Sequence, residues 1–429
     1  MSPEHTPSRF AANPAYVRCQ RLLKELQELM ARGEGESERA DAVRDAMEAI
    51  RNELDAAESL RIEELSADLY MLTDEEIFQD ISPEERATLP KRLQRAFDAG
   101  RFEEVLTLLR YGADFLPREA IAYLRGGCWF RLHDYEPAVW FFQYAHELAP
   151  RDPGTAVMVL DALWRAGRQA DVMERARGIV ENPSAHPQEL LAAAHILFCW
   201  AEQQEEAAAM PFYGMVVQAI ERALEKEASL PPAERIPAMT FTGRVGRALA
   251  LERLGRESEA RRAHQVNLQE YPKDHHVWTL AGLFESQRDV QRAVRYFQRA
   301  VELESRHVWP YLFLAYHRLE EGRFQEVIDL CRTGIELAPW KEDLARFYEW
   351  SAIARHRLGD PDRTVLELFE TATRLDPLNL AIRQNREAFE RFVAAQHAGP
   401  PPRLEASAVP NLSEAFRALS AFVTFAQAA

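Results

Sequence analysis

The stretch from Arg125 to Pro150 holds side chains whose types could do chemistry. Within it, Cys128 follows two glycines, and His133 and Asp134 lie five and six residues further on. A nucleophilic cysteine needs a thiolate, a base within reach and a partly exposed position. Residues five apart on one helix do not share a face, and free cysteine is often a small buried hydrophobe. The sequence therefore favours packing over catalysis at Cys128.

Other patterns that carry chemistry are missing from the sequence. It has no glycine-rich phosphate loop and no His-Glu-x-x-His zinc motif. The adjacent His275 and His276 open an expected helix after Asp274, and neighbouring residues seldom converge on one metal, so we expect solvated side chains there. Four cysteines show no paired spacing: Cys19, Cys128, Cys199 and Cys331. The sequence therefore predicts a protein that is not an enzyme, with no cofactor and no metal.

Charge and composition narrow the classes of partner. The 429 residues carry 52 basic and 68 acidic side chains, which gives a net charge of −16. This balance argues against nucleic acid, whose binding needs a basic face, and against an anionic membrane surface. It suits a protein or peptide partner of basic or apolar character. The sequence has no run of 18 apolar residues and no secretory signal pattern, so we expect a cytoplasmic protein without membrane insertion.

Turns of one kind recur along most of the chain. Strand signals are nearly absent, while apolar residues recur at helical spacing almost everywhere. Pro117, Pro150 and Pro183 lie 33 residues apart. The recurring turns read AGRFEEV (99–105), LHDYEPA (132–138), LGRESEA (254–260), QRDVQRA (287–293), EGRFQEV (321–327) and LGDPDRT (358–364). A period of this length indicates an array of helical repeats.

These units resemble tetratricopeptide repeats, which are helix–turn–helix modules of about 34 residues. The first stretch supplies the residues of the family pattern: Gly126, Trp129, Asp134, Tyr135, Ala138, Phe142, Ala145 and Pro150. The match covers residues 86–380, with the best units at 119–150, 241–272, 274–305 and 308–339. The resemblance implies an all-α fold, a TPR-like right-handed α-solenoid. In it, Gly126 is expected where two helices approach closely, and Gly127 on the neighbouring inner surface.

Some segments depart from the repeat pattern. Residues 13–80 predict an N-terminal helical hairpin with a connecting segment, and Ser37 is the expected N-cap of its second helix, over 38–60. The solenoid is expected over 86–397. Inside it, residues 186–238 are helical but off-pattern, and their prolines indicate a kink or a longer pair of helices. This irregular region would divide the array into two lobes.

The resemblance also implies a binding surface. Stacked helix pairs curve around a concave face that the first helix of each unit lines. Repeat phasing places five aromatic side chains on that face: Tyr123, Phe130, Trp278, Trp309 and Tyr316. Large aromatics are frequent hot spots of binding, but the same positions also suit the core between repeats. The Lys, Asn and Arg clamp of chaperone-binding members has no counterpart here, which favours an apolar peptide or helix as the ligand.

The C-terminal part predicts a tethered helix. Residues 398–410 contain three consecutive prolines and are expected to form an extended, flexible linker. Residues 411–429 predict an amphipathic helix whose docking face consists of Leu412, Phe416, Leu419 and Val423. Such a helix would dock in the groove of its own or a neighbouring chain, or it would cap the end of the solenoid.

Together these features predict a binding protein. The first hypothesis is a non-catalytic scaffold or adaptor that holds a peptide or helix in the concave groove. The alternative is a regulatory sensor that binds a small molecule or signalling peptide between the two lobes. In that case the irregular residues 186–238 would be the hinge.

Overall fold

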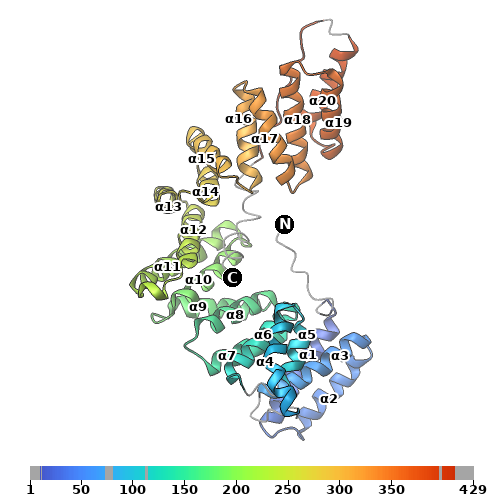
Figure 1. Ribbon diagram of the computed structural model, residues 1–429, viewed down its shortest axis with the longest axis vertical. Helices are drawn as coiled ribbons and strands as arrows, with labels where there is room; N and C mark the ends of the chain where they lie inside the picture. Colours follow the sequence, from blue (N-terminus) through green and yellow to red (C-terminus); the bar gives the residue numbers. More distant parts are fainter. Residues whose placement is uncertain (1–9, 11, 73–80, 112–114, 396–398, 411–429) are drawn as a thin grey trace. The chain divides into compact units, whose positions relative to one another are not determined.

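The protein is built of α-helices. The computed structural model describes residues 10, 12–72, 81–111, 115–395 and 399–410. These residues form twenty α-helices and two short 3₁₀ turns, and no strand occurs among them (Figure 1). The predicted all-α fold is thus confirmed. The chain divides into two compact units, whose boundary lies between Gly243 and Arg244.

The first unit begins with three helices, where the sequence predicted a hairpin of two. They are α1 (Pro14–Ala31), α2 (Glu38–Arg51) and α3 (Ala56–Leu69). Ser37 caps α2 as predicted, since its Oγ atom accepts the Ala40 N–H at 3.2 Å. The predicted second helix is wrong beyond Arg51, because Asp55 and Glu58 form a capping box that starts α3.

A buried polar network joins α1 and α3 to the rest of the first unit. Its centre is Asp134, which is 1% exposed and directly precedes α7 (Tyr135–Leu148). The Tyr16 hydroxyl donates to this carboxylate at 2.8 Å, and the Gln20 amide donates at 3.0 Å. The Arg61 guanidinium lies 3.7 Å from it. Asp134 therefore makes no side-chain cap on its own helix and instead anchors the N-terminal helices.

The other helices of the first unit pack in consecutive pairs (Figure 1). They are α4 (Pro83–Asp98), α5 (Phe102–Leu109), α6 (Arg118–Arg131), α7, α8 (Pro153–Arg165), α9 (Gln169–Glu181), α10 (Pro187–Ala201) and α11 (Glu206–Ser229). The turn inside three pairs contains a residue of positive φ, namely Gly100 at 69°, His133 at 60° and Gly167 at 71°. Glycine adopts this conformation without strain, and His133 takes the same place in its own repeat.

Close helix approach explains one of the two glycines before Cys128. A Cβ atom on Gly126 would lie 2.8 Å from the ring of Phe142, which packs against it from α7. The prediction of close approach at Gly126 is therefore confirmed. Gly127 has open space instead, because nothing lies within 4 Å of its virtual Cβ.

The irregular residues 186–238 form a long pair of helices. The helix α11 has 24 residues and continues through Pro211, and it packs along α10. A 3₁₀ turn (Pro232–Glu234) and the start of α12 (Pro237–Arg253) follow. The buried Glu227 holds this turn, since it accepts the Ile236 N–H at 3.2 Å and the Thr240 hydroxyl at 2.5 Å.

The second unit repeats the same construction. Its helices after α12 are α13 (Glu257–Glu270), α14 (His275–Glu285), α15 (Val290–Glu302), α16 (Val308–Glu320), α17 (Phe324–Leu337), α18 (Lys341–Leu358), α19 (Asp362–Leu375) and α20 (Leu380–Ala394). Gly255, Gly322 and Gly359 have φ values of 67°, 75° and 82° in the turns. A Cβ atom on Gly282 would lie 2.6 Å from the ring of Phe297, which repeats the contact seen at Gly126.

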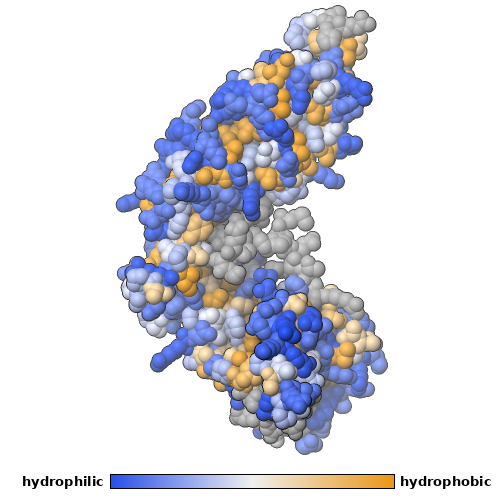
Figure 2. Space-filling view, viewed as in Figure 1, coloured by the Kyte–Doolittle hydropathy of each residue, from blue (hydrophilic) through white to orange (hydrophobic). Residues whose placement is uncertain are grey.

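The first helices of neighbouring pairs contact one another in the second unit. The helix α16 touches both α14 and α18, in addition to its own partner α17. On the face of the molecule in Figure 2, hydrophilic side chains predominate, and apolar ones gather in small groups between them. The consecutive first helices α16 and α18, together with α20, carry the site described next.

Candidate peptide-binding site

The second unit holds a piece of its own chain against its last helices. Residues 399–410 have no regular secondary structure. Residues 403–409 are called the docked segment, because two of them, Glu405 and Ser407, hydrogen-bond to α20 and α18. Leu404 and Ser407 of this segment are only 6% and 5% exposed. The predicted linker is therefore extended but is not a free tether, because side chains of two helices bind it.

Asn385 of α20 binds the backbone of the docked segment. Its Nδ2 atom donates to the Glu405 carbonyl at 2.7 Å, and its Oδ1 atom accepts the Glu405 N–H at 3.1 Å. Trp350 of α18 adds a hydrogen bond from its indole N–H to the Ser407 carbonyl at 3.1 Å. These bonds fix an extended chain without contacting its side chains, so they tolerate any residue but proline at position 405.

Glu349 of α18 supplies a buried carboxyl group at the same place. It is 0% exposed, and its Oε2 atom accepts both the backbone N–H of Ser407, at 3.1 Å, and the Ser407 hydroxyl. Its Oε1 atom accepts from Asn385 at 2.8 Å. Burial raises the pKa of Glu349, while these hydrogen bonds oppose the rise. A buried carboxylate needs donors, and the docked segment provides two of these three.

Aromatic rings line the site beside these polar groups. Trp350 is fully buried and meets the ring of Phe347 edge-on, with centroids 6.0 Å apart. The ring of Tyr316, from α16, lies 5.9 Å from that of Trp350. The structure therefore places one predicted groove residue, the half-buried Tyr316, next to the site.

The two tryptophans predicted for this face lie elsewhere in the second unit. Trp278 is half-buried, donates to the Pro272 carbonyl at 3.0 Å and packs on Tyr296. Trp309 is 3% exposed and stacks on His307, so it belongs to the core. A buried ring offers no surface to a ligand, so Trp309 cannot line a binding groove as the sequence predicted.

Tyr123 and Phe130 lie together in the first unit. Both rings pack on the buried Phe142, at 5.5 and 6.3 Å between centroids. Tyr123 is 38% exposed, whereas Phe130 is half-buried beneath the guanidinium of Arg165. Their edges reach the surface, and their role in binding stays a prediction.

Three residues of the site were not predicted from the sequence. Glu349 and Trp350 lie on α18, inside the predicted repeats, and Asn385 lies on α20, the last helix of the predicted solenoid. The sequence does place a glutamate and an asparagine on the apolar faces of two helices. Because buried polar groups need hydrogen-bond partners, these two residues could have indicated the site. The predicted tail-helix docking face, Leu412, Phe416, Leu419 and Val423, lies outside the described residues.

The side chains of the first stretch do not form a nucleophile with its base. Cys128 is 0% exposed, and burial raises the pKa of its thiol to about 12. The His133 ring hydrogen-bonds the Tyr135 hydroxyl at 2.8 Å, and Asp134 serves the N-terminal helices. A thiol held neutral and out of solvent suits packing, as the sequence predicted.

A second cysteine and histidine do lie close together, inside the first unit. The Sγ atom of Cys199 is 3.7 Å from the ring nitrogens of His195, one turn earlier on α10. Burial raises the pKa of the thiol to about 12 and lowers that of the imidazole to about 4. Both shifts favour the neutral forms, so the pair is not a thiolate–imidazolium pair.

The prediction of solvated histidines at the start of α14 is wrong. His276 Nδ1 lies 3.0 Å from His307 Nε2, and the ring of His275 is 5.5 Å from that of His307. Burial lowers the pKa of His276 to about 4 and that of His307 to about 3. The third ring comes from the start of α16 and packs over the other two. No group of three or more His, Cys, Asp or Glu suited to a metal ion occurs in the described part of the chain.

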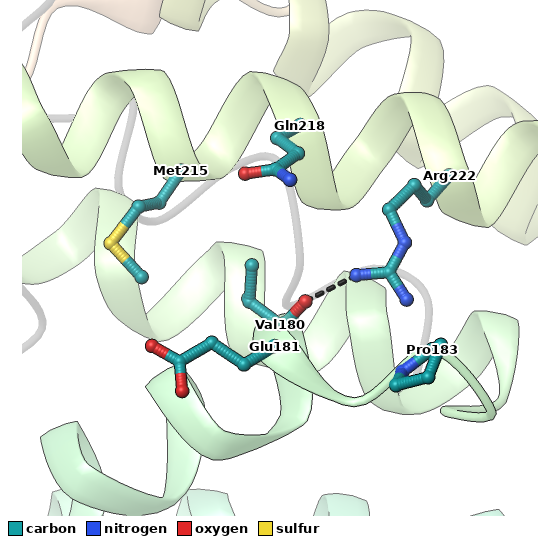
Figure 3. Close-up of a pocket in the computed structure, with 6 residues that line it drawn as sticks. All are labelled: Val180, Glu181, Pro183, Met215, Gln218 and Arg222. Carbon is teal, nitrogen blue, oxygen red and sulfur yellow. Dashed lines mark hydrogen bonds between the residues drawn. The ribbon is translucent and has the colours of Figure 1, made fainter.

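A shallow pocket of about 430 Å³ lies between α9 and α11 (Figure 3). It is lined by Val180, Glu181, Pro183, Met215, Gln218 and Arg222. Arg222 reaches across it from α11 and donates to the carbonyls of Val180 and Asn182, the latter at 2.7 Å. These bonds satisfy carbonyls at the end of α9, so the arginine serves helix packing.

Several solved structures of other proteins are similar to this chain at low sequence identity. No protein-family model matches the sequence, and no curated protein matches it. The C-terminal part of a TPR repeat-containing protein from Cytophaga hutchinsonii is 12% identical, with 68% of this chain and 98% of that chain covered and a TM-score of 0.39. A tetratricopeptide repeat protein from Parabacteroides merdae is 13% identical, with coverages of 71% and 98% and a TM-score of 0.37. Yeast Tom70 is 14% identical, with 72% of each chain covered and a TM-score of 0.32.

Similarities of this size carry no argument about function. The all-α repeat architecture rests on the chain's own helix pairs and on its turn residues of positive φ. None of the helices in the described ranges is long and apolar enough to cross a membrane.

Proposed function

We propose that this chain is a non-catalytic protein-interaction scaffold whose second unit binds an extended peptide along α18 and α20. One observation carries the proposal: Asn385 and Trp350 hydrogen-bond the backbone of the docked segment, and Glu349 accepts two of its donors. A site that binds backbone groups can also accept an extended chain supplied by another protein.

The electrostatics of the chain fit this role. The net charge of −16 favours partners of basic or apolar character over nucleic acid. The exposed edge of Tyr123 in the first unit is a second, separate surface that a partner could contact. Burial raises the pKa of the Cys128 and Cys199 thiols to about 12, so both stay neutral. Neutral, buried thiols favour a binding role over a catalytic one.

The test is whether the site binds its segment when the segment is supplied separately. In the full-length chain, residues 403–409 are replaced by Gly-Ser-Gly-Ser-Gly-Ser-Gly, which gives the Gly-Ser chain. A fluorescent peptide of residues 401–410 is then titrated, and its anisotropy is measured. We expect saturable binding to the Gly-Ser chain, and weaker binding to the natural chain, whose site is already occupied.

The control removes the backbone contact alone. Asn385→Ala in the Gly-Ser chain deletes two hydrogen bonds to the peptide and should weaken binding about tenfold or more. Absence of binding to a Gly-Ser chain with an unchanged circular dichroism spectrum would refute the proposed function.

A further inference from the structure

The docked segment shows which side chains the site requires. Of its seven residues, only Leu404 and Ser407 have buried side chains. Arg403 and Glu405 point into solvent, where they form an exposed ion pair with each other at 3.1 Å. Selectivity must therefore reside at two positions, three residues apart.

The serine position is chemically specific. The Ser407 hydroxyl donates to Glu349, a carboxylate with no exposed surface that accepts hydrogen bonds and cannot donate them while ionised. Hydrogen bonds to a buried charge are stronger than those between neutral groups, and a buried acceptor that loses its donor is costly. A residue without a side-chain donor at this position therefore binds less well.

The same carboxylate excludes negative charge. A phosphate on the serine would bring a charge of about −1.5 to −2 against Glu349 in a site with almost no solvent. Ser407 itself is only 5% exposed, so the site also has little room for the added group.

The leucine position is specific by burial. Leu404 is 6% exposed, which removes almost its whole side chain from water. Truncation of a buried leucine to alanine removes most of the apolar surface that its burial takes out of water, and it therefore weakens binding. Backbone recognition by Asn385 at the intervening position 405 sets the distance between the two side-chain sites.

From these contacts we infer that the partner is a protein segment that binds in extended form with the pattern Leu-x-x-Ser or Leu-x-x-Thr, and that Glu349 selects its unphosphorylated hydroxyl. This inference rests on the proposed function and names the ligand of the same site. The natural residues 403–409 then compete with the partner and occupy the site until it arrives.

A series of peptides tests the inference on the Gly-Ser chain. The peptides span residues 401–410 and carry serine, threonine, alanine, valine or phosphoserine at position 407. We expect serine and threonine to bind best, alanine and valine about 10- to 100-fold more weakly, and phosphoserine not measurably. A peptide with Leu404→Ala should bind at least about tenfold more weakly.

A matched variant isolates the carboxylate. In the Gly-Ser chain with Glu349→Gln, the preference for serine over alanine should shrink to within about threefold, because the charge that strengthens the bond is gone. If that variant does not fold, Ser407→Ala in the natural chain gives a second readout. It should speed amide exchange at Glu405, whereas Ala406→Gly should affect it less.

The outcomes separate the two proposals. Binding of all peptides with equal affinity would overturn the inference and leave the proposed function intact, whereas no binding of any peptide would refute the proposed function. The inference would also be overturned if the natural chain formed a concentration-dependent dimer that the Gly-Ser chain does not form. In that case the site would bind the segment of a second copy of this chain.

Discussion

Two adjacent glycines offer a sharp test of the repeat packing. Gly126 and Gly127 both lie on α6, but their surroundings differ. A Cβ atom on Gly126 would lie 2.8, 2.9 and 3.0 Å from three carbons of the Phe142 ring. That ring is 0% exposed and packs against Tyr123 and Phe130, so a shift that made room for the Cβ atom would disturb these contacts.

The expected effects have opposite signs. Gly126→Ala overpacks the contact at a cost of about 1–3 kcal/mol, and the better helix propensity of alanine offsets about 0.5–1 kcal/mol of it. Gly127→Ala has the better helix propensity of alanine, and its Cβ atom would have no other atom within 4 Å, so it should raise the free energy of unfolding by about 0.5–1 kcal/mol. The difference between the two variants is therefore the packing term alone.

Urea denaturation followed by circular dichroism measures this difference. Gly126→Ala should lower the midpoint of the transition and Gly127→Ala should raise it, with equal slopes. If both variants stabilised the protein equally, the close approach of α6 and α7 at Gly126 would be refuted. The same comparison at Gly282, whose virtual Cβ lies 2.6 Å from Phe297, would extend the test to the second unit.

Three further predictions concern the network, the histidines and the cysteines. Asp134→Ala should lower the free energy of unfolding by about 3 kcal/mol and speed trypsin cleavage in the N-terminal helices, because it removes the acceptor of Tyr16 and Gln20. Asp134→Asn keeps one side-chain oxygen that can accept such a hydrogen bond and should retain more stability, so equal losses in the two variants would contradict the role of the acceptor. The folded-state pKa values of about 4 for His276 and about 3 for His307 lie below the ordinary 6.5, so the free energy of unfolding should be highest above pH 6.5 and fall as the pH drops toward 4. Urea titrations at several pH values measure this profile. A flat profile, or one that His307→Gln leaves unchanged, would contradict the prediction. Cys128, at 0% exposure, should resist iodoacetamide in the folded chain and react after unfolding, so rapid labelling under native conditions would show that the thiol is accessible.

Local chemistry made the repeats predictable from the sequence. Turn glycines such as Gly322 and Gly359 adopt positive φ values that other residues disfavour, so they mark the turns that contain them in the sequence itself. The capping box of Asp55 and Glu58 is equally local and was available as the start of a third N-terminal helix.

Long-range contacts explain what the sequence did not reveal. Residues 398–410 look like a free linker because their prolines and small residues favour extended chain. Ser407 is held by Glu349, 58 residues earlier in the sequence, and Glu405 is held by Asn385, 20 residues earlier. His276 looked solvated for the same reason, since its partner His307 comes 31 residues later.

Amide hydrogen exchange at the docked segment tests the central claim most directly. The N–H groups of Glu405 and Ser407 donate to Asn385 and Glu349. In the natural full-length chain both should exchange at least about tenfold more slowly than in a free peptide of residues 401–410, and Asn385→Ala should remove most of that protection. Exchange of both amides at the rate of the free peptide would contradict the claim that the second unit binds an extended chain along α18 and α20.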